Sequence, residues 1–269
     1  MRLLSSLAAL CLAIGCAPMR PAPGSEALRV LVYNTHAGKD ASGADNLERL
    51  AALVRETRAD LVLFQEVDSA TTRSGGVDQL SVVRAATQMH GTFGGTLAFQ
   101  GGRYGLGVLS RFPIRMRQVV MLSGDTEPAT GRSREPRGAL HVVVARPAGD
   151  LHVVNTHLDA SAGDTWRLQE ATRLVALADS LRRAGARVIM GGDLNAIPGS
   201  AVHSIFRDAE LRDVWPECGT GPEATYPAHA PAKRIDYLLL TAAMRCTGAS
   251  VIATDASDHR PVLIDVNVR

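Results

Sequence analysis

Short apolar runs recur along the chain after residue 27, and most of them end in a cluster of polar residues. Runs of four to eight apolar residues bounded by turn residues are typical of buried strands. This pattern predicts strands over 28–33, 60–67, 188–191, 235–240, 250–253 and 262–268. Apolar residues at helical spacing predict helices over 46–57, 79–90, 164–183 and 201–208. Gly91 and Gly185 then follow two of these helices in the position where glycine often ends a helix.

The middle of the chain, residues 93–154, has a different pattern. Short apolar runs are separated there by Gly, Pro and charged loops, at 106–109, 117–122, 140–145 and 151–155. This alternation is typical of antiparallel strands and hairpins. The sequence has no internal repeat and no obvious linker after residue 28. We therefore predict a single α/β domain over 28–269, in which two packed sheets of mixed strands are flanked by helices.

The first 27 residues have the pattern of a targeting signal followed by a tether. Arg2 precedes an apolar run that is too short to span a bilayer and fits the core of a secretory signal. The stretch LAIGC at 12–16 resembles a bacterial lipobox, whose cysteine is lipidated, although Ala13 stands where leucine is usual. We predict a signal peptide over 1–16 with a lipobox-like Cys16, and a Pro/Ala-rich tether over 17–27. The alternative is a plain secretory signal with a chance cysteine.

These features predict an exported protein, periplasmic or at the cell surface. No later stretch approaches about 20 uninterrupted apolar residues, so we expect membrane contact only through a lipid anchor. We also expect a monomer.

The composition excludes several classes of protein. Of 269 residues, 46% are hydrophobic and 21% are charged, which excludes a disordered or collagen-like chain. The net charge of +2 gives no strong overall field for DNA or a membrane, although local patches can still bind either. The four cysteines contain no CxxC pair, so a thiolate zinc site is not expected. Cys218 and Cys246 could pair in an oxidising compartment, which sequence alone does not decide.

Polar clusters at the ends of the predicted strands point to a site. A single cluster is explained by turn formation, because Asn and Asp favour turns. Six clusters at the edges of buried strands exceed that explanation, since catalytic residues are commonly held on loops at strand ends. The clusters are Tyr33-Asn34-Thr35-His36, Gln65-Glu66-Val67-Asp68, Asn155-Thr156-His157, Gly192-Asp193-Leu194-Asn195, Arg234-Ile235-Asp236-Tyr237 and Ser257-Asp258-His259.

The residue types in these clusters indicate a chemistry. Carboxylate and amide oxygens suit Mg²⁺, Mn²⁺ or Ca²⁺ better than Zn²⁺. His157 and His259 can transfer a proton or stabilise an oxyanion, and Asp236 is a natural carboxylate partner for one of them. A hard cation, two histidines and a carboxylate base make a site for phosphate-ester hydrolysis. The oxygen donors are Asn34, Glu66, Asp193, Asn195 and Asp258.

The motifs resemble those of the endonuclease/exonuclease/phosphatase superfamily. This metal-dependent fold is shared by pancreatic-type DNase, the major abasic-site endonuclease, neutral sphingomyelinases and inositol-polyphosphate 5-phosphatases. The resemblance covers 28–268 and implies a four-layer α/β/β/α sandwich with the site at one edge of the paired sheets. It rests on YNTH at 33–36, QEVD at 65–68, YG-x-G-x-LSRFP at 104–113, NTHLD at 155–159, GDLNA at 192–196, RIDYLL at 234–239 and SDHRPV at 257–262, which stand in the family's order.

The resemblance also implies a role for each matching residue. It implies one or two metal ions, Mg²⁺ or Mn²⁺ with Ca²⁺ as a further option. No core position departs from the family pattern, which argues against an inactive homologue. The roles are Glu66 as principal metal ligand with Asn34 and Asp258 in support, Asp193 to orient or deprotonate the attacking water, Asn195 to hold the phosphate, His259 with its partner Asp236 to stabilise the transition state, His157 as a second phosphate-facing imidazole, and Tyr104 near the phosphate.

Several polar residues keep two interpretations. His36 either lines the site or ends its strand, and Asp68 either braces a ligand or, as we prefer, is a turn residue. Arginines at 103, 132, 134 and 137 either hold substrate phosphate or are solvated loop residues. Arg137 is the best substrate-binding candidate among them, because it directly precedes a predicted strand.

Together these features predict a divalent-metal-dependent phosphoester hydrolase that acts outside the cytoplasm by attack of water on phosphorus. A phosphodiesterase, in particular a nuclease, is slightly preferred. The alternatives are a phospholipid- or sphingomyelin-type phosphodiesterase and a phosphatase of small phosphate esters. The low net charge argues against a long DNA footprint, whereas the arginines between 111 and 137 favour an anionic substrate. A non-catalytic binding lipoprotein is less favoured, because the acid, base and metal positions are intact.

Overall fold

The computed structural model describes residues 27–123 and 135–268. The predicted signal peptide with Cys16, the tether, and two candidate arginines, Arg132 and Arg134, lie outside the described residues. Export and lipid anchoring therefore stay predictions. Within the described residues, no helix combines the length and the apolar character needed to cross a membrane.

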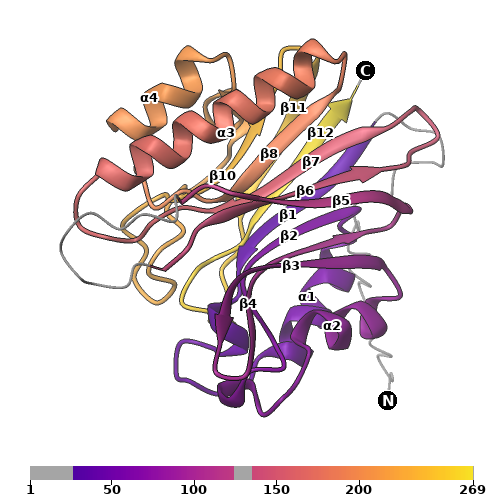
Figure 1. Cartoon of the computed structure of the whole chain (residues 1–269), viewed down its shortest axis with the longest axis vertical. Coiled ribbons are helices and arrows are strands. Elements are labelled where there is room, and N and C mark those ends of the chain that lie inside the picture. The colour runs from indigo at the N-terminus through magenta and orange to yellow at the C-terminus, as the bar shows by residue number, and fades with distance from the viewer. Residues whose placement is uncertain (1–26, 124–134, 269) are drawn as a thin grey trace, which may run out of the picture.

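Two six-stranded sheets form the centre of the domain (Figure 1). In each sheet one pair of neighbouring strands is parallel, β1 with β2 and β7 with β8, and the other neighbours are antiparallel. The first sheet has the order β11 (Met244–Val251), β12 (Val262–Val268), β1 (Ala27–Asn34), β2 (Leu61–Ser69), β4 (Gly102–Ser110) and β3 (His90–Phe99). The second has the order β5 (Ile114–Met121), β6 (Gly138–Val144), β7 (Leu151–His157), β8 (Val188–Asp193), β10 (Asp236–Leu240) and β9 (Arg212–Asp213).

Helices cover the outer faces of the two sheets, and this confirms the predicted four-layer sandwich (Figure 1). Helices α1 (Leu47–Thr57) and α2 (Gln79–Thr87) pack on the first sheet, and α3 (Thr165–Arg183) and α4 (Ala201–Asp208) pack on the second. Three short helices complete the described chain: η1 (His36–Gly38), η2 (Thr72–Ser74) and α5 (Trp215–Cys218).

Alternate residues of the strands fill the space between the sheets. Val30, Val32 and Leu63 of the first sheet pack in one apolar cluster with Leu140 and Val153 of the second, and all five are fully buried. Since side chains alternate along a strand, the intervening residues meet the helices on the outer faces. The central strands are therefore covered on both faces, which explains why their sequences are continuous apolar runs.

The structure corrects two predicted boundaries. The helix expected over 79–90 ends at Thr87, and His90 and Gly91 instead begin β3, a strand that was not predicted. The strand expected over 250–253 is longer and begins at Met244. Both β3 and β11 lie at an edge of the first sheet, where residues are only partly covered. Edge strands need no continuous apolar run, so their pattern is weak.

Cys218 and Cys246 form a disulfide, which settles the pairing that the sequence left open. Their Cα atoms are 5.8 Å apart. The bond fastens α5 to β11, the outermost strand of the first sheet.

A pair of histidines on the outer face of the second sheet makes stability depend on pH. His141 Nε2 lies 3.0 Å from His152 Nδ1, and burial lowers the pKa of His141 to about 4. The imidazole thus stays neutral in the folded protein at a pH where it is charged in the unfolded chain. We expect the free energy of unfolding to fall as the pH drops from about 6.5 towards 4.

A His141→Gln variant should lose less stability over this range than the wild type in urea denaturation at several pH values. His90→Gln, which changes an exposed histidine, is the control and should behave like the wild type. Parallel stability curves for the wild type and His141→Gln would contradict the assignment.

Candidate active site at the ends of the central strands

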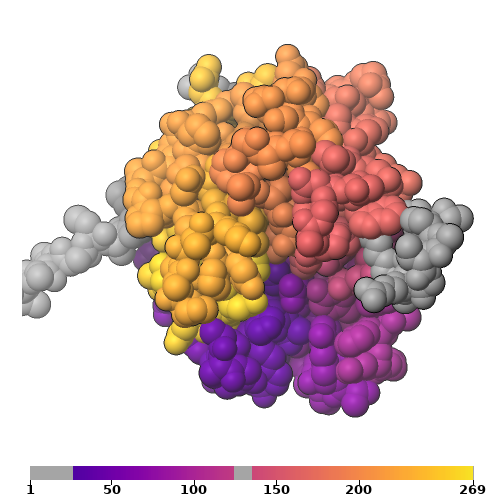
Figure 2. All heavy atoms as spheres, turned by 90° about the vertical axis from the view of Figure 1, so that its left-hand side faces the viewer, coloured from indigo at the N-terminus to yellow at the C-terminus, as the bar shows by residue number. Residues whose placement is uncertain are grey.

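The polar clusters meet around a cleft of about 830 Å³. Figure 2 shows the side of the molecule on which segments from both halves of the chain come together. Asn34 and Asp236 are buried. Asn34 is hydrogen-bonded to Glu66 and Asp193, Asp236 is hydrogen-bonded to His259, and these three partners line the cleft. The predicted residues that line it are Glu66, Tyr104, Arg137, His157, Asp193, Asn195, Asp258 and His259.

The strand register explains why distant motifs converge. Because β7 and β8 are parallel and β8 and β10 antiparallel, Asp193 has His157 beside it on one strand and Asp236 on the other. In the first sheet Asn34 and Gln65 are register partners, which brings the end of β1 next to Glu66. The carboxyl ends of the two parallel pairs therefore meet at one edge of the sandwich.

Asp193 lies at the centre of this arrangement. Its Oδ2 is 3.1 Å from Asn34 Nδ2, 3.5 Å from His157 Nε2 and 3.6 Å from His259 Nε2. Its Oδ1 accepts a hydrogen bond from the backbone N–H of Asn195 at 2.9 Å. Burial and the nearby Asp236 carboxylate raise the pKa of Asp193 to about 7, against the opposing effect of His259. Asp193 can thus change its protonation state near neutral pH.

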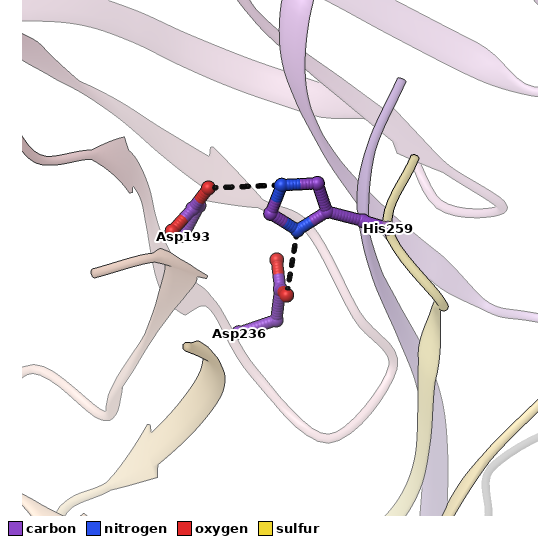
Figure 3. Close-up of side chains that lie close together, drawn as sticks. All are labelled: Asp193, Asp236 and His259. Carbon is purple, nitrogen blue, oxygen red and sulfur yellow. Dashed lines mark hydrogen bonds and ion pairs between the residues drawn. The ribbon is translucent and has the colours of Figure 1, made fainter. Parts of the chain in front are cut away.

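His259 is held between two carboxylates (Figure 3). Its Nδ1 lies 2.9 Å from Asp236 Oδ2, its Nε2 faces Asp193, and the ring of Tyr226 packs 4.8 Å away. Burial disfavours a charged imidazole, but the Asp236 and Asp193 carboxylates outweigh burial and raise the pKa of His259 to about 10. His259 is therefore an imidazolium at neutral pH.

His157 is neutral, in contrast to His259. It is buried, and burial together with the nearby positive charges of Arg137 and His259 keeps its pKa well below the usual value. Asn195 Nδ2 lies 3.1 Å from His157 Nε2 and also donates to the carbonyl oxygen of Leu158 at 3.0 Å. The cleft thus holds one cationic and one neutral imidazole.

Asn34 joins two carboxylates across the two sheets. Its Nδ2 donates to Glu66 Oε1 at 2.9 Å as well as to Asp193, and its Oδ1 accepts from the backbone N–H of His36 at 3.1 Å. Glu66 has a positive φ of 57° and lies at an irregularity of β2, between the register positions of Phe64 and Val67. Such an irregularity re-aims a side chain, here towards the cleft.

The oxygen donors fit a hard divalent cation. Asp193, Asp236 and His259 have ligand atoms within 4.8 Å of one another. An imidazole must be neutral to bind a metal, however, and both nitrogens of the His259 imidazolium face carboxylates. Glu66 and the partly exposed Asp258 line the cleft with carboxylate oxygens, so they fit Mg²⁺ or a similar ion better. The amide oxygen of Asn34 faces His36, so its role as a metal ligand stays a prediction.

The polar residues whose roles the sequence left open have different surroundings in the structure. Arg137 is buried, lines the cleft and pairs with Glu135 at 2.8 Å, whereas the Arg103 side chain donates to the carbonyl of Gly95. His36 Nδ1 lies 3.8 Å from Asp258 Oδ1 in the turn after β1. The preferred interpretation of Asp68 as a turn residue is wrong: it is fully buried in β2 and pairs with Arg73.

Several residues of the cleft were not predicted. Arg73, Glu135, Tyr226 and Lys233 line it, yet each lies outside the long helices and named strands and outside the recognised motifs. Arg73 pairs with Asp68, and the place of Asp68 in the QEVD motif is a sequence signal that could have pointed to this arginine.

Comparison with known proteins agrees with the fold. A family model described as the endonuclease/exonuclease/phosphatase family matches residues 31–259. A search of curated proteins finds no match. A family protein from Bacteroides thetaiotaomicron has a TM-score of 0.76 and 18% identity, over 90% of this chain and 95% of that one. A mannosyl-6-phosphatase from the same species has a TM-score of 0.73 and 20% identity, over 89% and 99%. The catalytic domain of human nocturnin with bound sulfate has a TM-score of 0.69 and 19% identity, over 89% and 93%.

The charge state of His259 can be measured directly. In protein kept free of metal with EDTA, the nuclear magnetic resonance signals of its imidazole should show the protonated form throughout pH 6 to 8.5. An Asp236→Asn variant removes one of the two stabilising carboxylates, so the pKa should fall and titration should move towards this range. The exposed His229 serves as internal control and should be unaffected by the substitution. A wild-type His259 that titrates near 6.5 would contradict the geometry.

Proposed function

Because the chain belongs to the endonuclease/exonuclease/phosphatase family, whose members hydrolyse phosphoester bonds, we propose that it catalyses the attack of water on the phosphorus of a small phosphate ester. One observation carries this proposal. A carboxylate with a pKa near 7 and an imidazole that is charged at neutral pH face the same cleft, with Oδ2 of Asp193 and Nε2 of His259 only 3.6 Å apart.

Asp193 is the general base of the proposed reaction. Its pKa near 7 lets it be ionised in a useful fraction of molecules and still accept a proton from water at neutral pH. The Asn34 amide and the Asn195 backbone N–H hold one oxygen each, so the carboxylate keeps its orientation while its charge changes. A water molecule beside Oδ2 would therefore be oriented for attack on a phosphorus in the cleft.

His259 stabilises the charge that develops on phosphate. Nε2 of the imidazolium faces Asp193 at the wall of the cleft, and Asp236 fixes the ring through Nδ1. A fixed cation in a partly dry site stabilises a developing oxyanion more strongly than the same charge in water. Arg137 adds a second buried positive charge, and Asn195 with neutral His157 adds polar groups that suit the remaining phosphate oxygens.

Glu66 and Asp258 would hold a divalent cation, which supplies charge neutralisation and Lewis-acid activation of the ester when bound. Asn34 keeps Glu66 close to Asp193, so the cation site and the base belong to one network.

The lining of the cleft supports a small substrate rather than a long nucleic acid. Its lining contains both basic and acidic side chains, in contrast to the continuous basic groove that tracks a phosphate backbone. Leu97, Phe99 and Ile197 add apolar surface for the non-phosphate part of an ester. Besides Asp193 and His259, the charged residues are Glu66, Arg73, Glu135, Arg137, Asp164, Arg167, Lys233 and Asp258.

The purified protein should hydrolyse p-nitrophenyl phosphate or bis-p-nitrophenyl phosphate with Mg²⁺ or Mn²⁺ and lose this activity in EDTA. Glu66→Gln removes the charge that holds the cation, so it should need far more metal for half-maximal rate. The panel also contains supercoiled plasmid and sphingomyelin. Preferred cleavage of plasmid would replace the proposed substrate by nucleic acid, and a Glu66→Gln variant as active as the wild type on every substrate would exclude the mechanism.

Asp193→Asn and His259→Gln should each lower kcat by about 10²–10⁴-fold, because each removes one acid–base or charge-stabilising group. Circular dichroism should show both variants folded. The exposed His229→Gln is the matched control and should keep wild-type kcat. The wild-type rate should also decline as the pH falls below about 7, where Asp193 becomes protonated.

A further inference from the structure

Arg73 is a cation of the cleft that the proposed mechanism does not use. It stands in η2, between β2 and α2, and its side chain is 39% exposed. It lines the same cleft as Glu66 and His259.

A buried carboxylate fixes one edge of the guanidinium. Arg73 Nε donates to Asp68 Oδ2 at 2.7 Å, and Arg73 Nη2 donates to Asp68 Oδ1 at 2.9 Å. Asp68 is fully buried, and the hydroxyl of Thr71 also donates to its Oδ2 at 2.9 Å. This two-bond contact sets the plane of the guanidinium as well as its position.

Two aromatic rings also contact the guanidinium. The guanidinium carbon lies 4.7 Å from the ring centre of Phe99 and 5.2 Å from that of Tyr104. Phe99 pairs with Gly102 and Leu97 with Tyr104, so both rings stand on the same face of the β3–β4 hairpin. These cation–π contacts hold the guanidinium next to this face of the hairpin.

The backbone around Arg73 is fastened as well. The N–H of Thr72 donates to the carbonyl oxygen of Gln100, and the N–H of Arg73 donates to Gln100 Oε1, both at 2.9 Å. These bonds tie η2 to the turn between β3 and β4. Arg73 is therefore held by its backbone, by its two hydrogen bonds to Asp68 and by its contacts with two aromatic rings.

Among the described residues, the other edge of the guanidinium, Nη1 with the second hydrogen of Nη2, has no such partner. Nη1 makes no hydrogen bond within the part of the chain that the structure describes. Arg167 in the same cleft differs, because its Nε, Nη1 and Nη2 all bind Asp164 or the carbonyls of Asp159 and Ser161. Arg73 thus offers a pair of donors in the geometry that phosphate and carboxylate oxygens accept.

We propose that Arg73 binds a second anionic group of the substrate, a phosphate or a carboxylate, while the scissile phosphate lies at Asp193 and His259. This inference rests on the proposed function for the position of the scissile phosphate. It narrows the substrate class to small phosphoesters that carry another acidic group. A guanidinium already held in place loses little conformational entropy on binding, which favours a specificity role.

The test compares two ligands that differ by one phosphate. Adenosine 3′,5′-bisphosphate and adenosine 5′-monophosphate are titrated by calorimetry with Mg²⁺ into protein carrying Asp193→Asn, which prevents turnover. The Asp193→Asn protein, which is the parent of the further variants, should bind the bisphosphate about tenfold more tightly than the monophosphate. A tenfold difference corresponds to about 1.4 kcal/mol. Adding Arg73→Gln should remove this preference and leave the affinity for the monophosphate nearly unchanged. Adding Arg207→Gln, an exposed arginine of α4 that pairs with Asp208, should leave both affinities unchanged.

Two further variants guard against unfolding, because Arg73→Gln leaves the buried Asp68 carboxylate unpaired. Arg73→Lys keeps a charge beside Asp68 but lacks the second edge. The combination Asp68→Asn with Arg73→Gln leaves no unpaired buried charge. Each should also lose the preference for the bisphosphate, and circular dichroism identifies the folded variants to be scored.

Equal affinity of the parent for the two ligands overturns the proposal, and so does a preference that survives in the folded Arg73 variants. The outcome is separable from that of the proposed function. A preference that depends on Arg73 in a protein whose wild type hydrolyses none of the tested esters supports this inference and rejects the function. Ester hydrolysis without any preference does the reverse.

Discussion

The burial of the Asp193 carboxylate between the two sheets is the constraint on which the rest of the site depends. A carboxylate that is 1% exposed is costly unless neighbouring groups compensate for its lost hydration. Asn34, His157, His259 and the Asn195 backbone supply that compensation within 3.6 Å. Asn34 stands on the first sheet and Asp193 on the second, so the two sheets cannot shift relative to each other without breaking this contact.

The same burial produces the unequal charge states of the site. Burial alone would make both histidines neutral, and this is the state of His157, which has positive neighbours. His259 is buried as well but stands between Asp236 and Asp193, and its charge is retained. A low-dielectric pocket therefore separates two chemically identical side chains into a cation and a neutral hydrogen-bonding group. The strand register sets the charged state of His259, since Asp236 and Asp193 are register partners on β10 and β8 and both carboxylates face the ring.

How far the sequence predicts this molecule depends on how completely each element is covered. Strands such as β1, β8 and β12 are covered by neighbours on both sides, and their apolar runs gave nearly correct bounds. The edge strands β3 and β11 are partly exposed and lack such runs, so one was missed and one was shortened. The motif residues were found because most of them lie at or next to the ends of well-covered strands, as Asn34 does on β1, His157 on β7 and Asp193 on β8. Arg73 was not found, because its contacts with Asp68 and Phe99 arise from a turn and a hairpin that no periodicity reveals.

The Asp68–Arg73 pair also shows why a buried charge in this fold calls for a functional explanation. Breaking a buried ion pair is costly, but replacing both partners by apolar residues is often neutral or stabilising. Stability alone therefore gives no reason to place a fully buried carboxylate beneath a partly exposed guanidinium at the wall of a cleft. The pair fixes one edge of an arginine that lines the cleft and leaves the other edge without a protein acceptor among the described residues. The proposed role of Arg73 in substrate recognition supplies a reason for the pair that stability alone does not.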